Sequence, residues 1–257
     1  MNRFKSKVAV VTGGGSGIGA AIALRLADEG TNVAIIELEA DRASETIDEI
    51  KTNGGTAQAF ACDVSNHEAT KQCFSEIETT FGPVNVLVNN AGIAHIGNLS
   101  NTTEADLDRI YNVNVKGVYN CMYAAIDGMV KNGGGAILNL ASIASKLGIL
   151  DRFAYSMSKG AVFTMTLSVA RDYIDQNVRC NCICPARVHT PFVDNFITKN
   201  YPGEEEATFK TLSEYQPIGR MGQPSEVASL VAFLCSEEAA FITGAAYDID
   251  GGVTQLR

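Results

Sequence analysis

The sequence lacks three features that would each point to a large class of partners. It has no cluster of lysine or arginine, no apolar run long enough to span a bilayer, and no signal-peptide segment before its first expected strand. Its formal net charge is −9 at pH 7, so phosphate backbones and anionic lipid would repel it. We therefore expect no nucleic acid and no membrane among its partners, and we expect a cytoplasmic protein.

The sequence also lacks the ligand spacing of a metal site. Its seven cysteines are an odd number, which favours reduced thiols where no secretory signal is seen. Three of them, Cys180, Cys182 and Cys184, alternate along an expected strand and share one face of it. No histidine or second cysteine pair completes a ligand set. We expect these cysteines to act as small buried hydrophobes, and we expect no metal.

What the sequence does have is a glycine-rich turn near its start. Residues 12–19 read TGGGSGIG, between a β-branched run at residues 7–11 and an Ala/Ile/Leu-rich segment at residues 20–27. A strand, a glycine turn and a helix form half of a nucleotide-binding crossover. The glycines let the backbone approach a diphosphate, and the helix N-terminus offers free N–H groups. Glycine runs also form ordinary turns, but the flanking strand and helix favour phosphate binding.

Expected strands and helices alternate along the whole chain. Strands are expected at residues 7–11, 31–37, 56–61, 84–88, 136–140, 178–184 and 246–249. Helices are expected at residues 20–27, 40–51, 65–81 (Ser65 and Glu68 match a capping box), 103–131 with a joint near Val113, 154–176 and 224–234. The sequence therefore predicts an α/β fold, with one domain over residues 1–257 and a doubly wound parallel sheet covered by helices on both faces. Ligands of such sheets bind at the carboxyl ends of the strands.

An acidic residue ends the second expected strand. Glu37 lies eighteen positions after Gly19, close to the spacing of an acid that hydrogen-bonds an adenosine ribose 2′-hydroxyl. A carboxylate there repels the 2′-phosphate of NADP, and Ser16 and Leu38 supply no cation to offset that repulsion. We therefore predict NAD as the cofactor. The alternative interpretation is a solvated acid at a strand end.

A tyrosine and a lysine four positions apart are expected on one helix face. Tyr155 and Lys159 share that face, and Ser142 follows the neighbouring expected strand. A free tyrosine titrates near 10, so its use as a base near neutrality requires a drop of about 3 pKa units, or about 4 kcal/mol. One cation at about 4 Å supplies that much at an effective dielectric of about 20. We predict that Lys159 lowers the pKa of Tyr155 while Ser142 holds the substrate oxygen.

With these motifs in view, the sequence resembles the short-chain dehydrogenase/reductase family over essentially its whole length. The motifs that carry the resemblance are residues 12–19, Asp63, the Asn-Asn-Ala-Gly turn at residues 89–92, Asn114, Ser142, Tyr155, Lys159 and Asn181. The resemblance implies a Rossmann-like domain and an NAD-dependent enzyme that interconverts a secondary alcohol and a ketone, or a sugar hemiacetal and a lactone. It also implies that Asn114, Ser142, Tyr155 and Lys159 are catalytic, with Asn114 holding a water in a proton relay through Lys159 and the ribose to Tyr155. The cofactor contacts implied by motif and resemblance are Gly13, Ser16, Gly17, Ile18, Gly19, Glu37, Asp63, Val64, Asn90, Ala91, Gly92, Tyr155, Lys159, Pro185, Val188 and Thr190.

One segment departs from the family pattern. The family usually has Pro-Gly after the sixth strand, where this chain has Pro185-Ala186. By resemblance Val188 and Thr190 would meet the nicotinamide carboxamide. Alanine disfavours positive φ, so the local backbone conformation at Ala186 is in question, although we expect the cofactor still to bind.

The substrate pocket should be bordered by the residues after Gly92, by those between Ser142 and Tyr155, and by residues 187–215. The last segment, with acidic residues 204–206, resembles a mobile lid. Candidate contacts are His95, Ile143, Arg152, His189 and Phe192, with Phe196 as a further apolar candidate. Several polar groups fit a polyhydroxylated molecule better than a steroid, and residues 186–192 loosely resemble sugar dehydrogenases of the family. We expect a small-molecule substrate that is a sugar, polyol or sugar acid.

Three alternatives stay open. A 3-oxoacyl-thioester reductase would need basic residues to meet an acidic carrier protein, and the segment around Lys131 is poor in arginine, although Arg171 is available. A steroid dehydrogenase of the same family is the second alternative. A catalytically silent dinucleotide-binding regulator is the third, and the intact catalytic set argues against it.

Two expected helical segments carry no charge. Residues 119–126 and 161–170 contain no Asp, Glu, Lys or Arg on any face, although a helix on an outer sheet surface should expose a polar stripe. We expect these helices to pack against another subunit, and the family resemblance suggests a homotetramer.

Overall fold

The computed structural model describes residues 2–256, apart from the side chains of Phe192 and Asn200. These residues form a parallel sheet of seven strands in the order β3-β2-β1-β4-β5-β6-β7. The strands are β1 (Val8–Thr12), β2 (Asn32–Glu37), β3 (Thr56–Ala61), β4 (Val86–Asn89), β5 (Gly135–Leu140), β6 (Val178–Pro185) and β7 (Ala246–Ile249).

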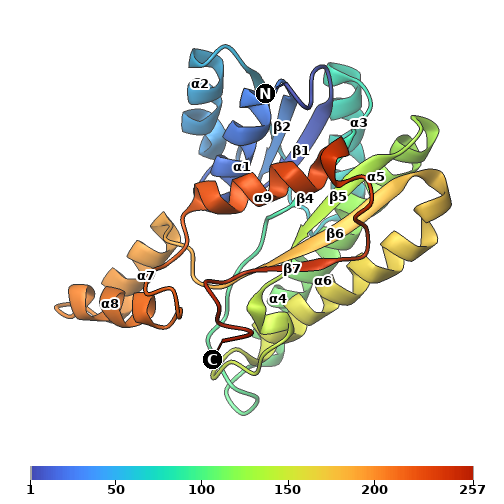
Figure 1. The fold of residues 1–257 in the computed structure, drawn as a ribbon. Helices are drawn as coiled ribbons and strands as arrows, with labels where there is room; N and C mark the ends of the chain where they lie inside the picture. The colour runs from blue at the N-terminus through green and yellow to red at the C-terminus, as the bar shows by residue number, and fades with distance from the viewer. Residues whose placement is uncertain (1, 257) are drawn as a thin grey trace.

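Helices cover both faces of this sheet (Figure 1). One face carries α1 (Gly17–Asp28), α2 (Ser44–Thr52) and α9 (Pro224–Cys235), and the other carries α3 (His67–Phe81), α5 (Gly117–Lys131) and α6 (Phe153–Asp172). Successive side chains of a strand point to opposite faces, so in β1 Ala9 and Val11 enter one core while Val8 and Val10 enter the other. The predicted single-domain, doubly wound α/β fold is confirmed.

The order of strands reverses at β1. This strand pairs with β2 on one side and with β4 on the other, so the chain builds the sheet outward in both directions from the same point. The loops that leave β1 and β4 therefore diverge at their carboxyl ends, which opens a crevice there. The glycine turn of residues 12–19 and the turn of residues 89–92 lie at this crevice.

The boundaries of two helical segments differ from the expected pattern. The joint expected near Val113 is a π-helical segment, Asn112–Lys116, between α4 (Glu104–Tyr111) and α5. The predicted capping box at Ser65 and Glu68 is wrong, because α3 begins at His67 and its N-cap is Asn66, whose side chain accepts a hydrogen bond of 3.1 Å from the Ala69 N–H. The Ser65 N–H is bound instead by the Asp63 carboxylate at 2.9 Å.

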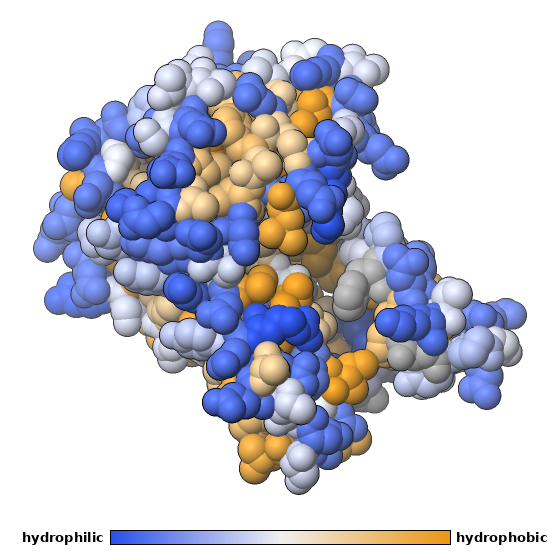
Figure 2. Space-filling model, turned by 180° about the vertical axis from the view of Figure 1, so that it is seen from behind, coloured by the Kyte–Doolittle hydropathy of each residue, from blue (hydrophilic) through white to orange (hydrophobic). Residues whose placement is uncertain are grey.

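Residues 191–215, which showed weak periodicity, form α7 (Pro191–Asn200) and α8 (Glu205–Glu214). The two helices pack against each other and stand off from the rest of the molecule (Figure 1). Seen from behind, the surface is hollowed between this pair of helices and the body (Figure 2).

The cysteines of β6 lie in the core. Cys180, Cys182 and Cys184 are fully buried among residues of α5 and α6, as small hydrophobes would be. The described part of the chain brings no three His, Cys, Asp or Glu side chains together in a way that could hold a metal ion. Nor does any described helix combine the length and the apolar character needed to cross a membrane.

Candidate active site

The glycine turn forms a cradle between β1 and α1. Gly13 and Gly17 have φ values of +66° and +55°, a region that L side chains rarely adopt. A Cβ atom on Gly19 would clash with the Gly13 carbonyl oxygen. Ser16, the N-cap of α1, makes no side-chain capping hydrogen bond, so the first N–H groups of the helix remain available to an anion such as a diphosphate.

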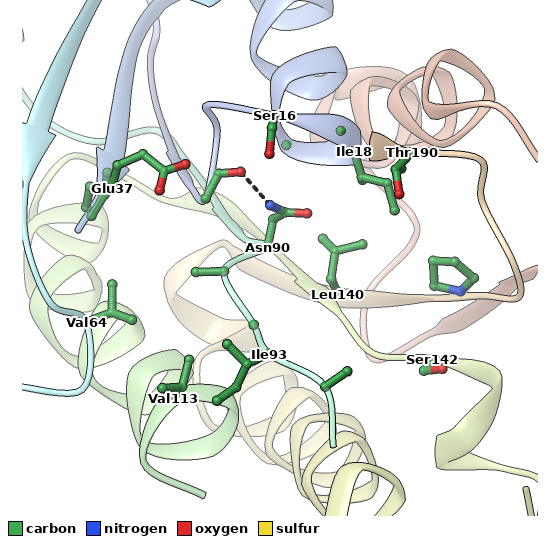
Figure 3. A pocket seen from close by; sticks show the side chains of 18 of the residues that line it. Ser16, Ile18, Glu37, Val64, Asn90, Ile93, Val113, Leu140, Ser142 and Thr190 are labelled. Carbon is green, nitrogen blue, oxygen red and sulfur yellow. Dashed lines mark hydrogen bonds between the residues drawn. The ribbon is translucent and has the colours of Figure 1, made fainter. Parts of the chain in front are cut away.

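The turn is fixed to the end of β4 by Thr12 and Asn90. The Asn90 side chain donates hydrogen bonds to the carbonyl oxygens of Thr12 and Gly13 at 3.0 and 2.9 Å (Figure 3). In return the buried Thr12 hydroxyl accepts from the backbone N–H groups of Asn90 and Ala91 at 3.0 and 2.9 Å. The Asn-Asn-Ala-Gly turn therefore positions the cradle, and Thr12 is a supporting residue that the sequence reading did not single out.

Glu37 faces the same cradle from the end of β2. One oxygen of its carboxylate accepts a hydrogen bond of 2.9 Å from the Gly15 N–H. Figure 3 shows Glu37 and Ser142 at opposite ends of the cavity. The carboxylate is therefore held in place with its second oxygen available to a hydroxyl group.

These residues line one cavity of about 480 Å³ at the carboxyl ends of the strands. Of the predicted residues, it is lined by Gly13, Ser16, Gly17, Ile18, Gly19, Glu37, Val64, Asn90, Ala91, Gly92, Ser142, Tyr155, Lys159, Pro185 and Thr190. Three of the predicted catalytic and cofactor-binding residues do not line it. Asp63 is exposed and holds the Ser65 N–H, Asn114 lies behind the wall, and Val188 lines a second cavity.

Tyr155 and Ser142 meet at one end of this cavity. Tyr155 is on the first turn of α6, and Ser142 is the N-cap of a short 3-10 turn after β5. Burial raises the pKa of Tyr155, while a hydrogen bond from Ser142 and the positive charge of Arg152 lower it. The two hydroxyl groups can therefore hold one substrate oxygen and exchange a proton with it.

Lys159 lies on the cavity wall beside the Tyr155 ring. Its Nζ atom lies 5.8 Å from the centre of the Tyr155 ring and donates a 2.6 Å hydrogen bond to the Leu140 carbonyl. Burial lowers the pKa of Lys159 to about 8, and Lys159 is not among the groups that lower the pKa of Tyr155. The predicted lowering of the Tyr155 pKa by this lysine stays a prediction.

Asn114 lies in the π-helical segment, behind the cavity wall. Its side chain exchanges two hydrogen bonds with the backbone of Ile93, at 2.8 and 2.9 Å, and donates a third to the Ser158 hydroxyl at 3.1 Å. Insertions of this kind shift the residues of a helix relative to a regular one. Here the shift lets a buried amide join the loop after β4 to α6, close to Lys159.

The predicted substrate contacts are dispersed. The His95 ring is turned into its own loop, 3.7 Å from an Asp106 oxygen and 3.5 Å from the Thr102 hydroxyl. His189 binds Asp194 at 2.8 Å, at the start of α7, and Ile143 is buried without lining either cavity. The side chain of Phe192 lies outside the described residues, and Phe196 contacts the Tyr201 ring.

Ala186 adopts an ordinary conformation. The described non-glycine residues with positive φ are Ser6, Asp151 and Asn177, so the Pro185-Ala186 departure from the family pattern introduces no backbone strain. The N–H of Ala186 donates to the Ile249 carbonyl at 3.2 Å, which ties the end of β6 to β7.

The sequence reading missed two features of the site. Arg42 lines the cavity near Glu37 and pairs with Glu39 at 3.3 Å. Its position within an expected helix did not indicate that it would reach the cavity. A second cavity of about 310 Å³ is lined by Arg187 and Val188 together with residues far along the chain, including residues 248–251. These segments meet because β7 pairs with β6 at the edge of the sheet.

Comparison with known proteins identifies the family of the chain. A family model described as enoyl-(acyl carrier protein) reductase matches residues 13–254. The chain is 39% identical to 2-(S)-hydroxypropyl-CoM dehydrogenase 3 of Xanthobacter autotrophicus, over 99% of each protein. It belongs to the short-chain dehydrogenase/reductase family.

Solved structures agree with this assignment. L-sorbose reductase of Gluconobacter frateurii, in complex with NADPH and L-sorbose, superposes with a TM-score of 0.94 at 30% identity over 99% of each chain. Aldohexose dehydrogenase of Thermoplasma acidophilum gives a TM-score of 0.88 at 35% identity, covering 98% of this chain and 96% of that one. The chain is accordingly an oxidoreductase that acts on CH–OH groups of small molecules with a nicotinamide dinucleotide.

Proposed function

We propose that the protein is an NAD-dependent dehydrogenase that interconverts a secondary alcohol and a ketone, or a sugar hemiacetal and a lactone. The observation that carries the proposal is the meeting of Ser142 and Tyr155 at one end of a cavity whose other end is the glycine cradle with Glu37. A bound nicotinamide would supply the hydride chemistry. The cradle, the anchored carboxylate and the free helix N–H groups fit a dinucleotide.

The protein side chains supply the proton chemistry. In alcohol oxidation, Ser142 donates a hydrogen bond to the reacting oxygen and Tyr155 accepts its proton. Lys159 and Asn114 would connect Tyr155 to solvent, the latter through its position beside Lys159. The roles of all four residues are part of the proposal.

Tyr155→Phe tests it. The variant removes the proton-transferring hydroxyl, and we expect kcat to fall by at least about 10²- to 10⁴-fold, the usual contribution of general acid–base catalysis. Tyr173→Phe, at the far end of α6, is the matched control and should keep its activity. Near-native turnover by Tyr155→Phe would overturn the mechanism.

The choice of NAD rests on Glu37. Its carboxylate, fixed by the Gly15 N–H, would lie against the 2′-phosphate of NADP. Arg42, the one cation among the described residues lining this cavity besides Lys159, is paired with Glu39. The L-sorbose reductase structure contains NADPH, so the fold alone does not select NAD, and we expect the charges around Glu37 to select it here.

Glu37→Gln tests the cofactor choice. We expect the parent enzyme to show the higher kcat/KM with NAD, and the variant to shift the NAD-to-NADP ratio toward NADP by about 10-fold, since removing one nearby charge is worth more than about 1 kcal/mol. Glu45→Gln removes an equal charge from the exposed side of α2 and should leave the ratio unchanged. A parent that prefers NADP would refute this part.

For the substrate we propose a sugar, polyol or sugar acid. Two structural neighbours at 30% and 35% identity have sugar-related names, L-sorbose reductase and aldohexose dehydrogenase, which supports this choice. The matching family model is named after an acyl-carrier-protein reductase, so an acyl thioester is the alternative substrate. NAD-linked assays across sugars, sugar acids, steroids and 3-oxoacyl thioesters would decide, and activity confined to the last two would refute the sugar proposal while leaving the dehydrogenase assignment intact.

The remaining parts of the proposal concern assembly and location. Tyr119 and Tyr123 of α5, and Met157 and Leu167 of α6, expose between 37% and 51% of their surface, which supports burial of these helices in a homotetramer. We propose that α7 and α8 act as the lid over the substrate. We also propose that the enzyme works in the cytoplasm.

A further inference from the structure

Two arginines stand near the reacting end of the active site without an acidic partner. Arg152 is the N-cap of α6, three residues before Tyr155. Its guanidinium donates a hydrogen bond of 2.8 Å to the backbone carbonyl of the neighbouring Asp151. Arg187 follows β6, two residues after Pro185, which lines the first cavity. Neither takes part in an ion pair with any described residue, whereas Arg3, Arg25, Arg42, Arg109 and Arg220 all do.

Arg187 is the more confined of the two. Its guanidinium carbon lies 5.7 Å from the centre of the Tyr215 ring, and its Nε atom is buried with no hydrogen-bond partner among the described residues. Burial, followed by the like charge of Arg152, lowers the pKa of Arg187. The fold therefore leaves a buried guanidinium donor of Arg187 unsatisfied, which costs free energy unless a ligand compensates.

Acidic side chains are close by but are committed elsewhere. The second cavity, which Arg187 lines, also has Glu226, Asp248 and Asp250 in its wall. Glu226 binds Arg220 at 2.7 and 2.8 Å, Asp248 binds Lys146 at 2.7 Å, and Asp250 accepts backbone N–H groups. Although the chain has a net charge of −9, no carboxylate among the described residues forms an ion pair with either arginine.

We propose that Arg187, with Arg152 beside it, binds the carboxylate of an acidic substrate whose carbinol reacts at Tyr155. A guanidinium presents a planar fork of donors that matches a planar carboxylate, and both cations here are guanidinium groups. The inference rests on the proposed dehydrogenase function and narrows its substrate to hydroxy acids, of which a sugar acid is one kind.

The test compares substrates that differ only in the acid group. We would measure NAD-linked kcat/KM for D-gluconate against D-sorbitol, and for 3-hydroxybutyrate against 2-butanol. For whichever pair the parent oxidises better, its kcat/KM should be at least about 10-fold higher with the acid than with the neutral compound. Arg187→Gln and Arg152→Gln should each reduce that preference about 10-fold, the lower end of the effect of losing a charge-assisted hydrogen bond. Arg187→Lys, which keeps the charge, should retain part of it.

Arg171→Gln is the matched control. This arginine lies in the last turn of α6, at the opposite end of the helix from Arg152 and Tyr155, so its loss should leave the preference unchanged. Equal use of acid and neutral substrates by the parent, or an unchanged preference in both arginine variants, would overturn the inference and leave the dehydrogenase proposal standing. Sorbitol 6-phosphate used better than gluconate would also overturn it, in favour of a phosphate.

A binding measurement separates the two proposals. Isothermal titration of 3-hydroxybutyrate and gluconate into the parent and into Arg187→Gln requires no turnover. If no compound is oxidised but one of the acids binds the parent and binds the variant at least about 10-fold more weakly, the dehydrogenase proposal fails and the carboxylate site stands. If neither acid binds the parent, or the variant binds as tightly as the parent, the carboxylate site fails.

Discussion

Replacing Lys159 by methionine should make the protein more stable. Lys159 is almost fully buried, and burial lowers its pKa from 10.5 to about 8. The unfolded chain therefore binds a proton more tightly than the folded chain does, and below pH 8 the folded state bears the full cost of a buried charge. A shift of this size corresponds to about 3 kcal/mol at pH 7.

Methionine removes the charge and keeps most of the volume. It also removes the 2.6 Å hydrogen bond to the Leu140 carbonyl, a loss of about 1 kcal/mol. We expect a net gain of about 2 kcal/mol at pH 7, which corresponds to a rise in Tm of about 4 to 8 °C for a chain of this size.

The pH dependence is the diagnostic measurement. As pH rises from 8 toward 10.5 the folded lysine loses its proton before the unfolded one does, so the parent gains stability relative to the variant. The advantage of Lys159→Met in urea unfolding, measured at a fixed protein concentration, should therefore vanish near pH 10.

Lys146→Met is the matched control. Lys146 is partly exposed and pairs with Asp248 at 2.7 Å, so its loss should leave stability unchanged or slightly reduced at every pH. If Lys159→Met were no more stable than the parent, or if its advantage did not change with pH, the assigned burial cost would be wrong.

Three further predictions follow from the same geometry. Gly19→Ala should weaken NAD binding by more than about 10-fold and lower Tm, because its Cβ would clash with the Gly13 carbonyl oxygen. Gly160→Ala on α6, where a Cβ meets no atom within 4 Å, should do neither. Equal effects of the two variants on NAD binding in fluorescence titration would count against the proposed glycine cradle. Ser142→Ala removes the hydrogen bond that lowers the pKa of Tyr155, so the pH at which alcohol oxidation reaches half its maximum should rise, and an unchanged pH profile would contradict this. Leu167→Glu should dissociate the proposed homotetramer in light scattering, while Leu99→Glu, in an exposed loop, should not. A monomeric parent at micromolar concentration would refute the assembly proposal.

Local periodicity in the sequence predicts the alternation of strands and helices. Strands such as β1 show runs of β-branched residues and helices such as α1 show 3.6-residue spacing, and each depends on neighbours within a few positions. The glycine turn, Glu37 and the Tyr155–Lys159 pair were found for the same reason: each is a short spacing on one element, and the parallel topology brings strand ends together. The order of the seven strands then reverses between β1 and β4, where a crevice forms.

The tertiary structure decided which partner each polar side chain takes. His95 and His189 were plausible substrate contacts, but Asp106 and Asp194 engage them. The ammonium of Lys159 donates a hydrogen bond to the Leu140 carbonyl at the end of β5. In each case the outcome depends on where a loop or strand end from another part of the chain is placed.

Burial and long-range charge set the remaining properties of the site. The raised pKa of Tyr155 and the lowered pKa of Lys159 have burial as their largest cause, and burial depends on segments from several parts of the chain. Spacing along a chain carries no information about desolvation, because desolvation is the sum of what every other segment places around a group. The sequence by itself therefore determined the fold and the reaction class, while the packing of β5, β6 and β7 determined the electrostatics of the site and left Arg152 and Arg187 without an ion pair among the described residues.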